Sequence, residues 1–266
     1  MTTRAGLLGW PVEHSISPVM HNAAFRALGL NWSYDLLPVE PSRLQAEIMT
    51  LLEDGYVGFN VTIPHKQQVL NLPGVEPEPA VQTLGAANTL VRQGDRLRAH
   101  NTDWTGFRDD LEAHDVHPAG WDCLVLGTGG SAAAVAYALR RMAAASVTFV
   151  SRSPEGRADT IGYADLDDHQ AVRLVVNCTP LGMHPRVEGS PWPQKLPLPD
   201  CAVIYDLVYN PVRTQLVAQA EAAGLRALSG LGMLVRQGAA AFALRTGQQP
   251  PLPVMLNAAQ TALGGS

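Results

Sequence analysis

One stretch decides the fold of this chain: Asp122-Cys123-Leu124-Val125-Leu126-Gly127-Thr128-Gly129-Gly130-Ser131-Ala132. Its apolar first half predicts a buried strand, and its second half has the spacing G-x-G-x-x-A ahead of a helix of small residues at 133–142. Gly127 permits a tight turn, Gly129 lets the backbone approach a pyrophosphate closely, and Ala132 keeps the helix near the strand. Because a second strand follows at 146–150, the stretch predicts a βαβ unit that binds a dinucleotide.

The end of the second strand indicates which dinucleotide binds. NAD-binding units place Asp or Glu there to bond the ribose 2′-hydroxyl, whereas this chain has Ser151-Arg152-Ser153, with Arg157 close by. A carboxylate would repel a 2′-phosphate, and an arginine flanked by hydroxyls binds it. The sequence therefore predicts NADP in preference to NAD, and it leaves open whether Arg157 joins Arg152.

The segments that follow extend this unit. Strands are expected at 173–177 and 202–207, and each leads into a polar turn on the nucleotide side of a parallel sheet. Between them, the proline-rich segment 185–199 predicts a surface loop. The remaining expected elements are a helix at 212–223 and a short strand at 225–228, followed by the segment 229–237, from which a helix continues to about 245.

Strands and helices also alternate in the first part of the chain, which predicts a largely parallel sheet there. A hairpin with its turn at 93–95 follows, and then a helix from about 103 to 113. The elements expected before the hairpin are strands at 5–9, 32–39 and 55–61 and helices at 19–28 and 42–52.

The chain is therefore expected to form two α/β domains. Residues 103–237 form a Rossmann-type, doubly wound NADP-binding domain. The last helix, at 254–263, has no place left in that domain and is expected to pack back on the first one. The substrate-binding domain is accordingly predicted as 1–102 plus 238–266.

Lys66 is the most informative residue outside the nucleotide unit. Of the 19 lysines and arginines, only Lys66 and Lys195 are lysines, and an ammonium can lose its proton near neutral pH when partly buried. Pro64 suits the first turn of a helix, which would put Lys66 just past a strand's carboxyl end, where ligands bind in open α/β sheets. The alternative is a solvated surface lysine. Asp103, at a predicted helix start, either caps that helix or pairs with Lys66.

The segment His14-Ser15-Ile16-Ser17-Pro18 carries two hydroxyls one residue apart, ahead of a helix that opens with proline. Such a pair can donate to one anion beside the helix N-terminus. The same residues can also serve as a simple helix N-cap, and these residues alone leave both interpretations open.

Composition and charge exclude several classes of function. Hydrophobic residues make up 46% and charged residues 16%, as in ordinary globular proteins. The net charge is −5 and there is no basic run, so we expect no nucleic-acid partner. No apolar run reaches the length of about 20 residues that spans a membrane, and the N-terminus lacks the apolar run of a signal peptide, so we expect neither membrane association nor export.

The cysteines and histidines predict no metal centre. The three widely spaced cysteines, Cys123, Cys178 and Cys201, are expected to be reduced core thiols of a cytoplasmic protein. No pair among the eight histidines shows the spacing of metal ligands, so a metal-dependent hydrolase has no support, and His65 is expected to serve its own turn.

Taken together, these motifs resemble the shikimate dehydrogenase family, and the resemblance covers nearly the whole chain in the family's order. The matching segments are His14-Ser15-Ile16-Ser17-Pro18, Asn60 to Lys66, Ala87-Asn88-Thr89, Asn101-Thr102-Asp103, Gly127 to Ala132, Ser151-Arg152-Ser153, Asn177 to Met183, Tyr205 to Pro211, and Gly230 to Gln237. The resemblance implies an oxidoreductase that reduces 3-dehydroshikimate to shikimate with NADPH, on the route to aromatic amino acids. It implies small-molecule partners, and a monomer or a homodimer.

The same resemblance assigns roles to residues. The implied catalytic pair is Lys66 and Asp103. The residues implied to bind substrate are Ser15 and Ser17 with Tyr209 at the carboxylate, and Thr62, Asn88, Asp103 and Gln237 at the ring hydroxyls. The residues implied to line the cofactor are Gly127, Thr128, Gly129, Gly130, Ser131, Ser151, Arg152, Ser153, Leu207 and Gly230.

Three rival interpretations share parts of this pattern. A quinate/shikimate dehydrogenase that uses NAD is disfavoured by Ser151-Arg152-Ser153. A non-catalytic NADP-binding sensor would be expected to lack Lys66 or Asp103, and both are present. A methylenetetrahydrofolate dehydrogenase-like enzyme would share the two-domain plan, but the Ser-x-Ser and Asn-Thr-Asp segments suit a small hydroxy acid better than a pterin.

Overall fold

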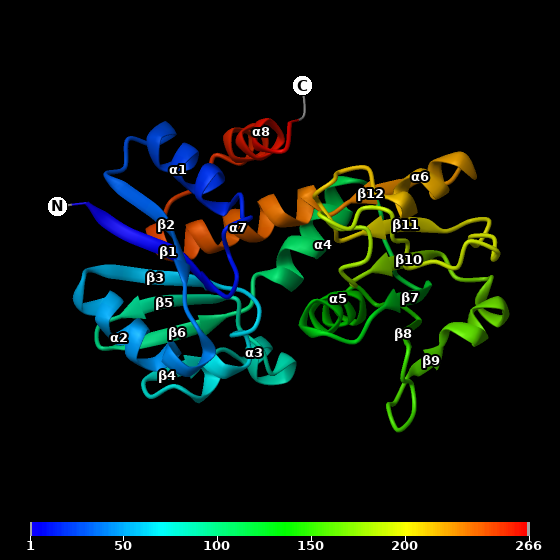
Figure 1. Cartoon of the computed structure of the whole chain (residues 1–266), viewed down its shortest axis with the longest axis horizontal. Coiled ribbons are helices and arrows are strands. Elements are labelled where there is room, and N and C mark those ends of the chain that lie inside the picture. Colours follow the sequence, from blue (N-terminus) through cyan, green and yellow to red (C-terminus); the bar gives the residue numbers. More distant parts are fainter. Residues whose placement is uncertain (1, 265–266) are drawn as a thin grey trace. The chain divides into compact units, whose positions relative to one another are not determined.

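Residues 2–264 are described by a computed structural model, in which the chain divides into two units (Figure 1). Unit 1 combines Met1–Gly106 with Val235–Ser266, and unit 2 is Phe107–Leu234. Two helices, α4 (Asp103–Ala113) and α7 (Leu231–Thr246), each begin in one unit and end in the other. Unit 1 is thus built from two segments far apart in the sequence.

Unit 1 contains a six-stranded mixed sheet in the order β2-β1-β3-β5-β6-β4. Its strands are β1 (Thr3–Gly9), β2 (Trp32–Pro38), β3 (Tyr56–Val61), β4 (Val75–Pro77), β5 (Thr89–Gln93) and β6 (Arg96–His100). β1 pairs in parallel with β2 and β3, but β5 pairs antiparallel with both β3 and β6. The expected hairpin is confirmed, and because it inserts two reversed pairings the expectation of a largely parallel sheet is only partly right.

Helices cover this sheet on both faces. The helices of unit 1 other than α4 and α7 are α1 (Ser17–Ala27), α2 (Leu44–Glu53), α3 (Pro79–Leu84) and α8 (Leu252–Ala262), with short 3-10 turns at Pro41–Arg43 and Gln68–Asn71. Leu44, Ile48 and Leu51 of α2 share a core cluster with Phe59 and Val61 of β3. Side chains alternate along a strand, so Asn60 points to the opposite face.

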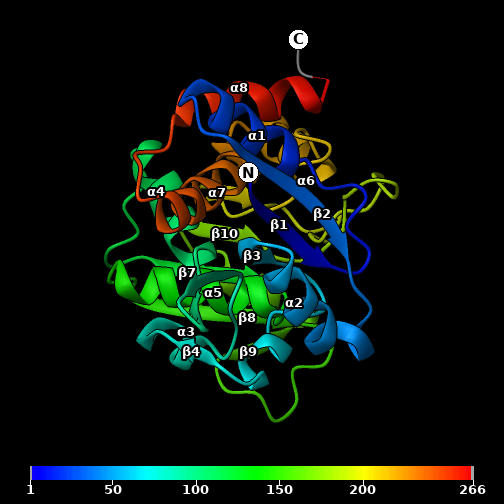
Figure 2. The same ribbon diagram turned by 90° about the vertical axis from the view of Figure 1, so that its left-hand side faces the viewer.

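That opposite face is covered by α1 and α7. His21 and Phe25 of α1 and Phe242 of α7 form an aromatic cluster with Tyr34 of β2 and Trp32. The expected return of the last helix to this part of the molecule is confirmed, because α8 packs along α1 (Figure 2).

Unit 2 contains a six-stranded sheet in the order β12-β11-β10-β7-β8-β9. All its pairings are parallel. Its strands are β7 (Asp122–Leu126), β8 (Ser146–Ser151), β9 (Thr160–Gly162), β10 (Leu174–Asn177), β11 (Val203–Asp206) and β12 (Ala227–Ser229), and its own helices are α5 (Gly130–Arg141), a 3-10 helix at Tyr163–His169 and α6 (Gln215–Ala222). The predicted Rossmann-type sheet is confirmed.

The strand order of unit 2 reverses next to β7. The chain runs from β7 outward to β8 and β9, then returns to place β10 on the other side of β7. Ligands of open α/β sheets bind at the carboxyl ends of the strands where the order reverses. The topology therefore directs a ligand to the turns that follow β7 and β10.

Some local expectations are wrong. Pro64 does not open an α-helix, and residues 63–67 form turns instead. Trp10 N donates to Ile63 O and His65 Nε2 lies 2.7 Å from Val39 O, and these contacts hold the segment against neighbouring chain. The helix expected at 212–223 begins only at Gln215, where the Thr214 hydroxyl caps it by accepting from Val217 N.

The proline-rich segment 185–199 is irregular, as expected, but it is not wholly a surface loop. Trp192 and Leu198 are buried in the core of unit 2 beside Leu216 of α6, as their apolar side chains favour. The cysteines are free, and Cys201 is exposed in the turn before β11, so the expectation of a core thiol is wrong for that residue.

Candidate active site

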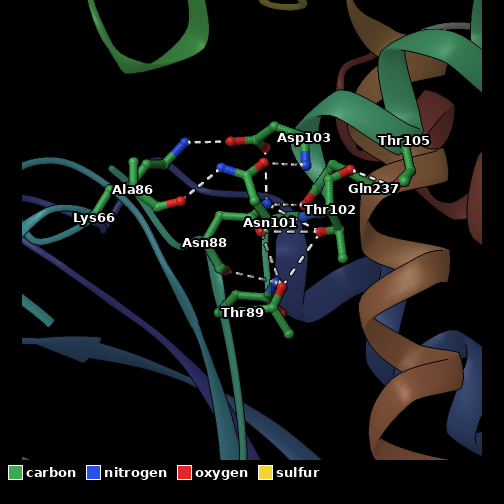
Figure 3. Close-up of polar contacts among 10 residues, drawn as sticks. Lys66, Ala86, Asn88, Thr89, Asn101, Thr102, Asp103, Thr105 and Gln237 are labelled. Atoms are coloured by element: carbon green, nitrogen blue, oxygen red, sulfur yellow. Dashed lines mark hydrogen bonds and ion pairs between the residues drawn. The ribbon is translucent and has the colours of Figure 1, made fainter. Parts of the chain in front are cut away.

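The turn after β3 and the start of α4 bring a cation and an anion together. Lys66 Nζ donates to Asp103 Oδ2 at 2.7 Å (Figure 3). The side chains of Lys66 and Asp103 are only 19% and 11% exposed. A pair this sheltered is screened by salt less than a surface pair and forms a charge-assisted hydrogen bond. The sequence left open a solvated lysine, and the geometry does not support that alternative.

Strand pairing explains why residues 37 positions apart meet. β5 lies between β3 and β6, with Thr89 opposite both Asn60 and His100. This register puts the residues before β5 and after β6 at the edge where β3 ends. Backbone bonds complete the arrangement, because Ala87 N donates to Lys66 O at 2.8 Å and the Asn101 side chain donates to Ala86 O at 2.9 Å.

Asn88 holds the second oxygen of the Asp103 carboxylate. Its Nδ2 lies 2.8 Å from Asp103 Oδ1 and 3.3 Å from Gln237 Oε1, and its Oδ1 accepts from Thr102 N at 2.6 Å (Figure 3). One carboxylate oxygen thus faces the lysine and the other faces an amide. Four of the residues singled out from the sequence are therefore brought together: Lys66, Asn88, Asp103 and Gln237.

The sequence left open that Asp103 caps α4, but Asn101 bonds the backbone at the start of this helix instead. Asn101 Oδ1 accepts from Asp103 N at 3.1 Å, as a side chain does at a helix start. The Asp103 carboxylate is thereby left to Lys66 and Asn88.

The two serines lie at the carboxyl end of β1. Ser15 Oγ lies 3.1 Å from Ser17 Oγ and accepts from Ser17 N at 3.2 Å. The first N–H groups of α1 are bonded locally, because Ser17 N donates to Ser15 Oγ and the N–H groups of Val19 and Met20 donate to Ile16 O. The serine hydroxyls are therefore the groups here that suit an anion.

Gly9 brings the serine loop close to Thr62. A methyl group added at Gly9 would lie 2.4 Å from Thr62 Cγ2 and 2.6 Å from Val12 Cγ1, so only glycine lets these two loops approach here. Ser15 N in turn donates to Val12 O at 3.0 Å. Thr62 and Ser15 therefore lie at one edge of the first sheet.

In unit 2, the glycine-rich turn joins β7 to α5. Gly127 has φ of +105°, and a methyl group there would lie 3.2 Å from Thr179 Cγ2 in the turn after β10. At Gly129 and Gly130, by contrast, a methyl group would meet no atom of the described chain within 4 Å. No side chain caps α5, so its first N–H groups lack a partner from the cap. This open backbone at a helix N-terminus suits a pyrophosphate.

The end of β8 supplies the cation. Ser151 Oγ accepts from Ser153 N at 3.1 Å and donates to Ser153 O at 3.2 Å, which folds the strand end around Arg152. Arg152 is exposed, and its positive charge opposes the rise that burial causes in the pKa of Tyr163. Arg157 is exposed too and lies in a turn closed by its own N–H on Pro154 O.

A buried carboxylate organises the remaining turns of unit 2. Asp206 accepts from Asn177 Nδ2 at 2.8 Å, from Val208 N at 3.0 Å and from the Thr214 hydroxyl at 2.6 Å. Burial raises the pKa of Asp206, and these three donors oppose the rise. The turns after β10 and β11 are thereby tied to the start of α6.

Leu207 and Gly230, both assigned to the cofactor, lie against each other. A methyl group at Gly230 would lie 2.0 Å from Leu207 O, so the backbone allows only glycine there. Tyr209, assigned with Ser15 and Ser17 to the substrate carboxylate, belongs to unit 2, and burial raises its pKa. Its assigned role stays a prediction.

The sequence assigned no role to several polar residues that support the site: Asn60, Thr89, Asn101, Thr102, Asn177 and Asp206. All are buried in unit 1 or unit 2 although polar residues usually stay exposed. The sequence feature that could have identified them is a polar residue in, or directly after, an apolar strand. Among residues 2–264 we find no group of three or more His, Cys, Asp or Glu arranged to hold a metal ion, and no helix with the length and apolar character of a membrane span.

Comparison with known proteins shows which families and relatives the chain resembles. Residues 7–90 match the shikimate dehydrogenase substrate binding domain, and residues 230–260 match the shikimate 5′-dehydrogenase C-terminal domain. The shikimate dehydrogenase (NADP+) of Moorella thermoacetica is 41% identical over 283 aligned residues, covering 100% of this chain and 95% of the relative.

Solved structures agree with the sequence relatives. A Thermus thermophilus shikimate 5-dehydrogenase in complex with NADP(H) and shikimate has a TM-score of 0.89 and 35% identity, covering 98% of this chain and 100% of that one. A Corynebacterium glutamicum quinate dehydrogenase in complex with NAD has a TM-score of 0.88 and 28% identity, covering 98% and 99%. With this identity over its full length, the chain belongs to the shikimate dehydrogenase family.

Proposed function

We propose that this chain catalyses the reversible, NADPH-dependent reduction of 3-dehydroshikimate to shikimate, a step of the shikimate pathway. The observation that carries the proposal is the sheltered Lys66–Asp103 pair at 2.7 Å, with Asn88 on its second carboxylate oxygen, in a chain of this family. Residues 1–102 plus 238–266 form the substrate-binding domain, and residues 103–237 form the NADP-binding domain.

The substrate is a carboxylate with ring hydroxyls, and the assigned side chains suit both groups. Ser15 and Ser17 donate to the carboxylate, with Tyr209 assisting. Thr62, Asn88, Asp103 and Gln237 hold the ring oxygens. Short hydroxyl and amide side chains of this kind reject an analogue that lacks a hydroxyl, because their buried polar atoms would lose their partners.

Reduction adds a hydride to the carbonyl carbon and a proton to the carbonyl oxygen. NADPH, when bound, supplies the hydride. The Lys66 ammonium stabilises the charge that develops on the oxygen and donates the proton to it, and solvent returns a proton to the resulting amine. Asp103 keeps the ammonium in place and accepts from a neighbouring substrate hydroxyl. Proton transfer by a positioned side chain contributes about 10²–10⁴-fold to the rate.

The residues of unit 2 fit the cofactor on their own geometry. The open space beside Gly129 and Gly130 at the uncapped start of α5 accommodates a pyrophosphate, and exposed Arg152 suits a 2′-phosphate. We assign the remaining cofactor contacts to Gly127, Thr128, Ser131, Ser151, Ser153, Leu207 and Gly230. We further propose that the enzyme acts in the cytoplasm, as a monomer or a homodimer, on small molecules alone.

Loss of nicotinamide absorbance tests the proposal directly. The purified protein is mixed with 3-dehydroshikimate and NADPH, and with NADH in a parallel assay. The reverse reaction is run with shikimate or quinate and with NADP+ or NAD+, and is followed by the gain of the same absorbance. We expect the fastest turnover with 3-dehydroshikimate and NADPH. No oxidation of NADPH would refute the proposal, and faster turnover of quinate with NAD would establish the alternative, a quinate/shikimate dehydrogenase that uses NAD.

A further inference from the structure

Within residues 2–264, Arg245 on α7 is a half-buried cation that has no acidic partner and contacts the polar residues behind the site in unit 1. Arg245, on α7, donates from Nη2 to Asn60 Oδ1 at 2.7 Å, and its guanidinium lies 5.4 Å from the centre of the Tyr34 ring. His21 stacks on Tyr34 with 4.2 Å between the ring centres. The Nη1 atom of Arg245 is buried and has no hydrogen-bond partner in residues 2–264.

Burial makes this cation an expensive way to stabilise the fold. Burial lowers the pKa of Arg245, and within the described part of the chain Tyr34 is the one group whose charge or hydrogen bond offsets that loss. A buried cation without a carboxylate costs free energy, and an apolar side chain of similar volume is often equally stable or more so. An arginine at this position therefore needs another explanation.

We explain the arginine by its hydrogen bonding, because a guanidinium can donate hydrogen bonds but cannot accept them. Asn60 Oδ1 accepts from Arg245 and also from the Tyr34 hydroxyl at 2.8 Å. A tyrosine hydroxyl can donate or accept, so by itself it would tolerate either orientation of the Asn60 amide. A guanidinium has five N–H donors and no acceptor. Arg245 therefore turns the amide oxygen of Asn60 toward α7 and its Nδ2 toward β5.

The fixed amide sets the next hydrogen bonds along β5. Asn60 Nδ2 donates to Thr89 Oγ1 at 3.2 Å and to Asn88 O at 3.4 Å. The Thr89 hydroxyl, having accepted from Asn60, donates its one proton to Asn88 Oδ1 at 3.2 Å. Asn88 then presents Nδ2 to Asp103 Oδ1, and Figure 3 shows this half of the series from Thr89 to Lys66.

We propose that Arg245 is a positioning residue for the reaction, acting through Asn60 and Thr89 on Asn88 and so on the Lys66–Asp103 pair. The inference rests on the proposed function. Without Arg245, the Asn60 amide can invert, which turns its oxygen toward the Asn88 carbonyl oxygen and toward Thr89. The Thr89 proton is then shared between Asn60 and Asn88. Asn88 Oδ1 keeps the bond from Thr102 N but loses part of the bond from Thr89, so Asn88 is held less firmly on Asp103.

The test is Arg245→Met, which removes the donors and the buried charge but keeps an unbranched side chain. We expect shikimate kcat to fall about tenfold, the cost of losing one or two oriented hydrogen bonds. The affinity for NADP should stay unchanged, and the unfolding temperature should be equal or higher. A loss of turnover without a loss of stability is a combination that a purely structural arginine would not produce.

Arg4→Met is the matched control. Arg4 also lies over a tyrosine of the same sheet, 4.3 Å from the Tyr56 ring, and has a polar partner in Asp35, but it has no contact in the series to Asn88. It should turn over shikimate like the wild type. An Arg245→Met variant with wild-type kcat, or with no greater loss than Arg4→Met, overturns the inference.

A double-mutant cycle tests the route. Thr89→Val removes the hydroxyl through which Arg245 is proposed to act, so Arg245→Met should add little further loss of kcat in that background. Independent, multiplying losses would contradict the proposal. If Arg245→Met does not fold, Arg245→Lys decides: its ammonium also only donates, so it should keep more than half of wild-type kcat, and a folded variant below a tenth would overturn the inference. Inactive wild-type enzyme would instead refute the proposed function.

Discussion

Lys66 and Lys195 are the chain's two lysines, and they differ in every respect that matters for catalysis. Lys66 is paired with Asp103 and sheltered, whereas Lys195 is exposed in the loop between β10 and β11. We expect Lys66→Ala to lower kcat by about a thousandfold while KM changes little, because the proton donor acts in the transition state. Steady-state kinetics check this, with Lys195→Ala expected to match the wild type. A Lys66→Ala variant that keeps half its turnover would remove the lysine from the mechanism.

Arg152 is expected to decide which cofactor is used. Hydrogen bonds to charged groups contribute about 1.5–3 kcal/mol, so Arg152→Ala should raise KM for NADPH by about tenfold or more and leave KM for NADH nearly unchanged. Arg140→Ala is the control, because Arg140 is an exposed arginine of the same unit whose partner is Asp159. Equal effects on both cofactors would show that Arg152 does not contact the 2′-phosphate.

We expect His21 to make the free energy of unfolding depend on pH. Burial, and then the charge of Arg245, lower the pKa of His21 well below 6.5. The unfolded chain therefore binds a proton at pH values where the folded one does not. The contribution of His21 to the free energy of unfolding is fully present above about pH 6.5. Below that pH it falls by about 1.4 kcal/mol per pH unit, until the pH reaches the pKa of His21 in the folded chain.

Replacing His21 by phenylalanine should remove this dependence while keeping an aromatic ring stacked on Tyr34. Urea unfolding at about pH 7.5 and about pH 5.5 measures it. The wild type should lose more free energy of unfolding between the two than His21→Phe does. Identical losses in the two proteins would mean that His21 does not stay neutral in the fold.

Among the structural elements, the turn from β7 to α5 contains one glycine that the fold requires, Gly127, and one that is proposed to serve cofactor binding, Gly129. Gly129 is extended, with φ of −82°, and a methyl group there meets nothing in the described chain, so Gly129→Ala should cost less than about 1 kcal/mol of stability. The methyl group would nevertheless lie where the pyrophosphate is proposed to bind. We expect KM for NADPH to rise about tenfold or more, since close backbone approach is lost.

Gly127→Ala is the contrasting variant. Its φ of +105° and the nearby Thr179 methyl make a side chain unfavourable in the fold itself. Stability should fall by about 1–2 kcal/mol, as expected for a left-handed conformation without glycine. Thermal unfolding with and without NADPH distinguishes the two variants, and a Gly129→Ala protein with wild-type KM would contradict the proposed pyrophosphate site.

The elements themselves were largely predictable, because their signals are local. Apolar strand patterns, the β5–β6 hairpin and the glycine-rich turn all depend on neighbouring residues, and the structure confirms them. The short elements β4 and α3 were not predicted, since β4 has only three residues and proline interrupts the segment. The helix expected after Pro64 was wrong because contacts with Trp10 and Val39, directly after β1 and β2, hold that segment as turns.

At the scale of the whole molecule, one crossing joins two distant parts of the chain. A methyl group at Gly106 of α4 would lie 2.7 Å from both the N and Cβ atoms of Gln237 on α7. Gly106→Ala should therefore lower the free energy of unfolding by about 1–3 kcal/mol, although alanine is the better helix former. Glu112→Ala, on the exposed face of α4, is the control. A Gly106→Ala protein as stable as the wild type would mean that the helices do not approach this closely.

Local residue patterns were enough to indicate the turn that suits a dinucleotide, the arginine that favours NADP, and the lysine and aspartate of the proposed pair. The folded chain was needed to show that Lys66 and Asp103 lie 2.7 Å apart, that Asn88 joins them, and that Arg245 reaches Asn60. The difference comes from how far apart in the sequence the interacting residues lie. Turns and strands follow from neighbouring residues, whereas these contacts depend on the register of β3, β5 and β6 and on where α7 packs, which no local pattern records.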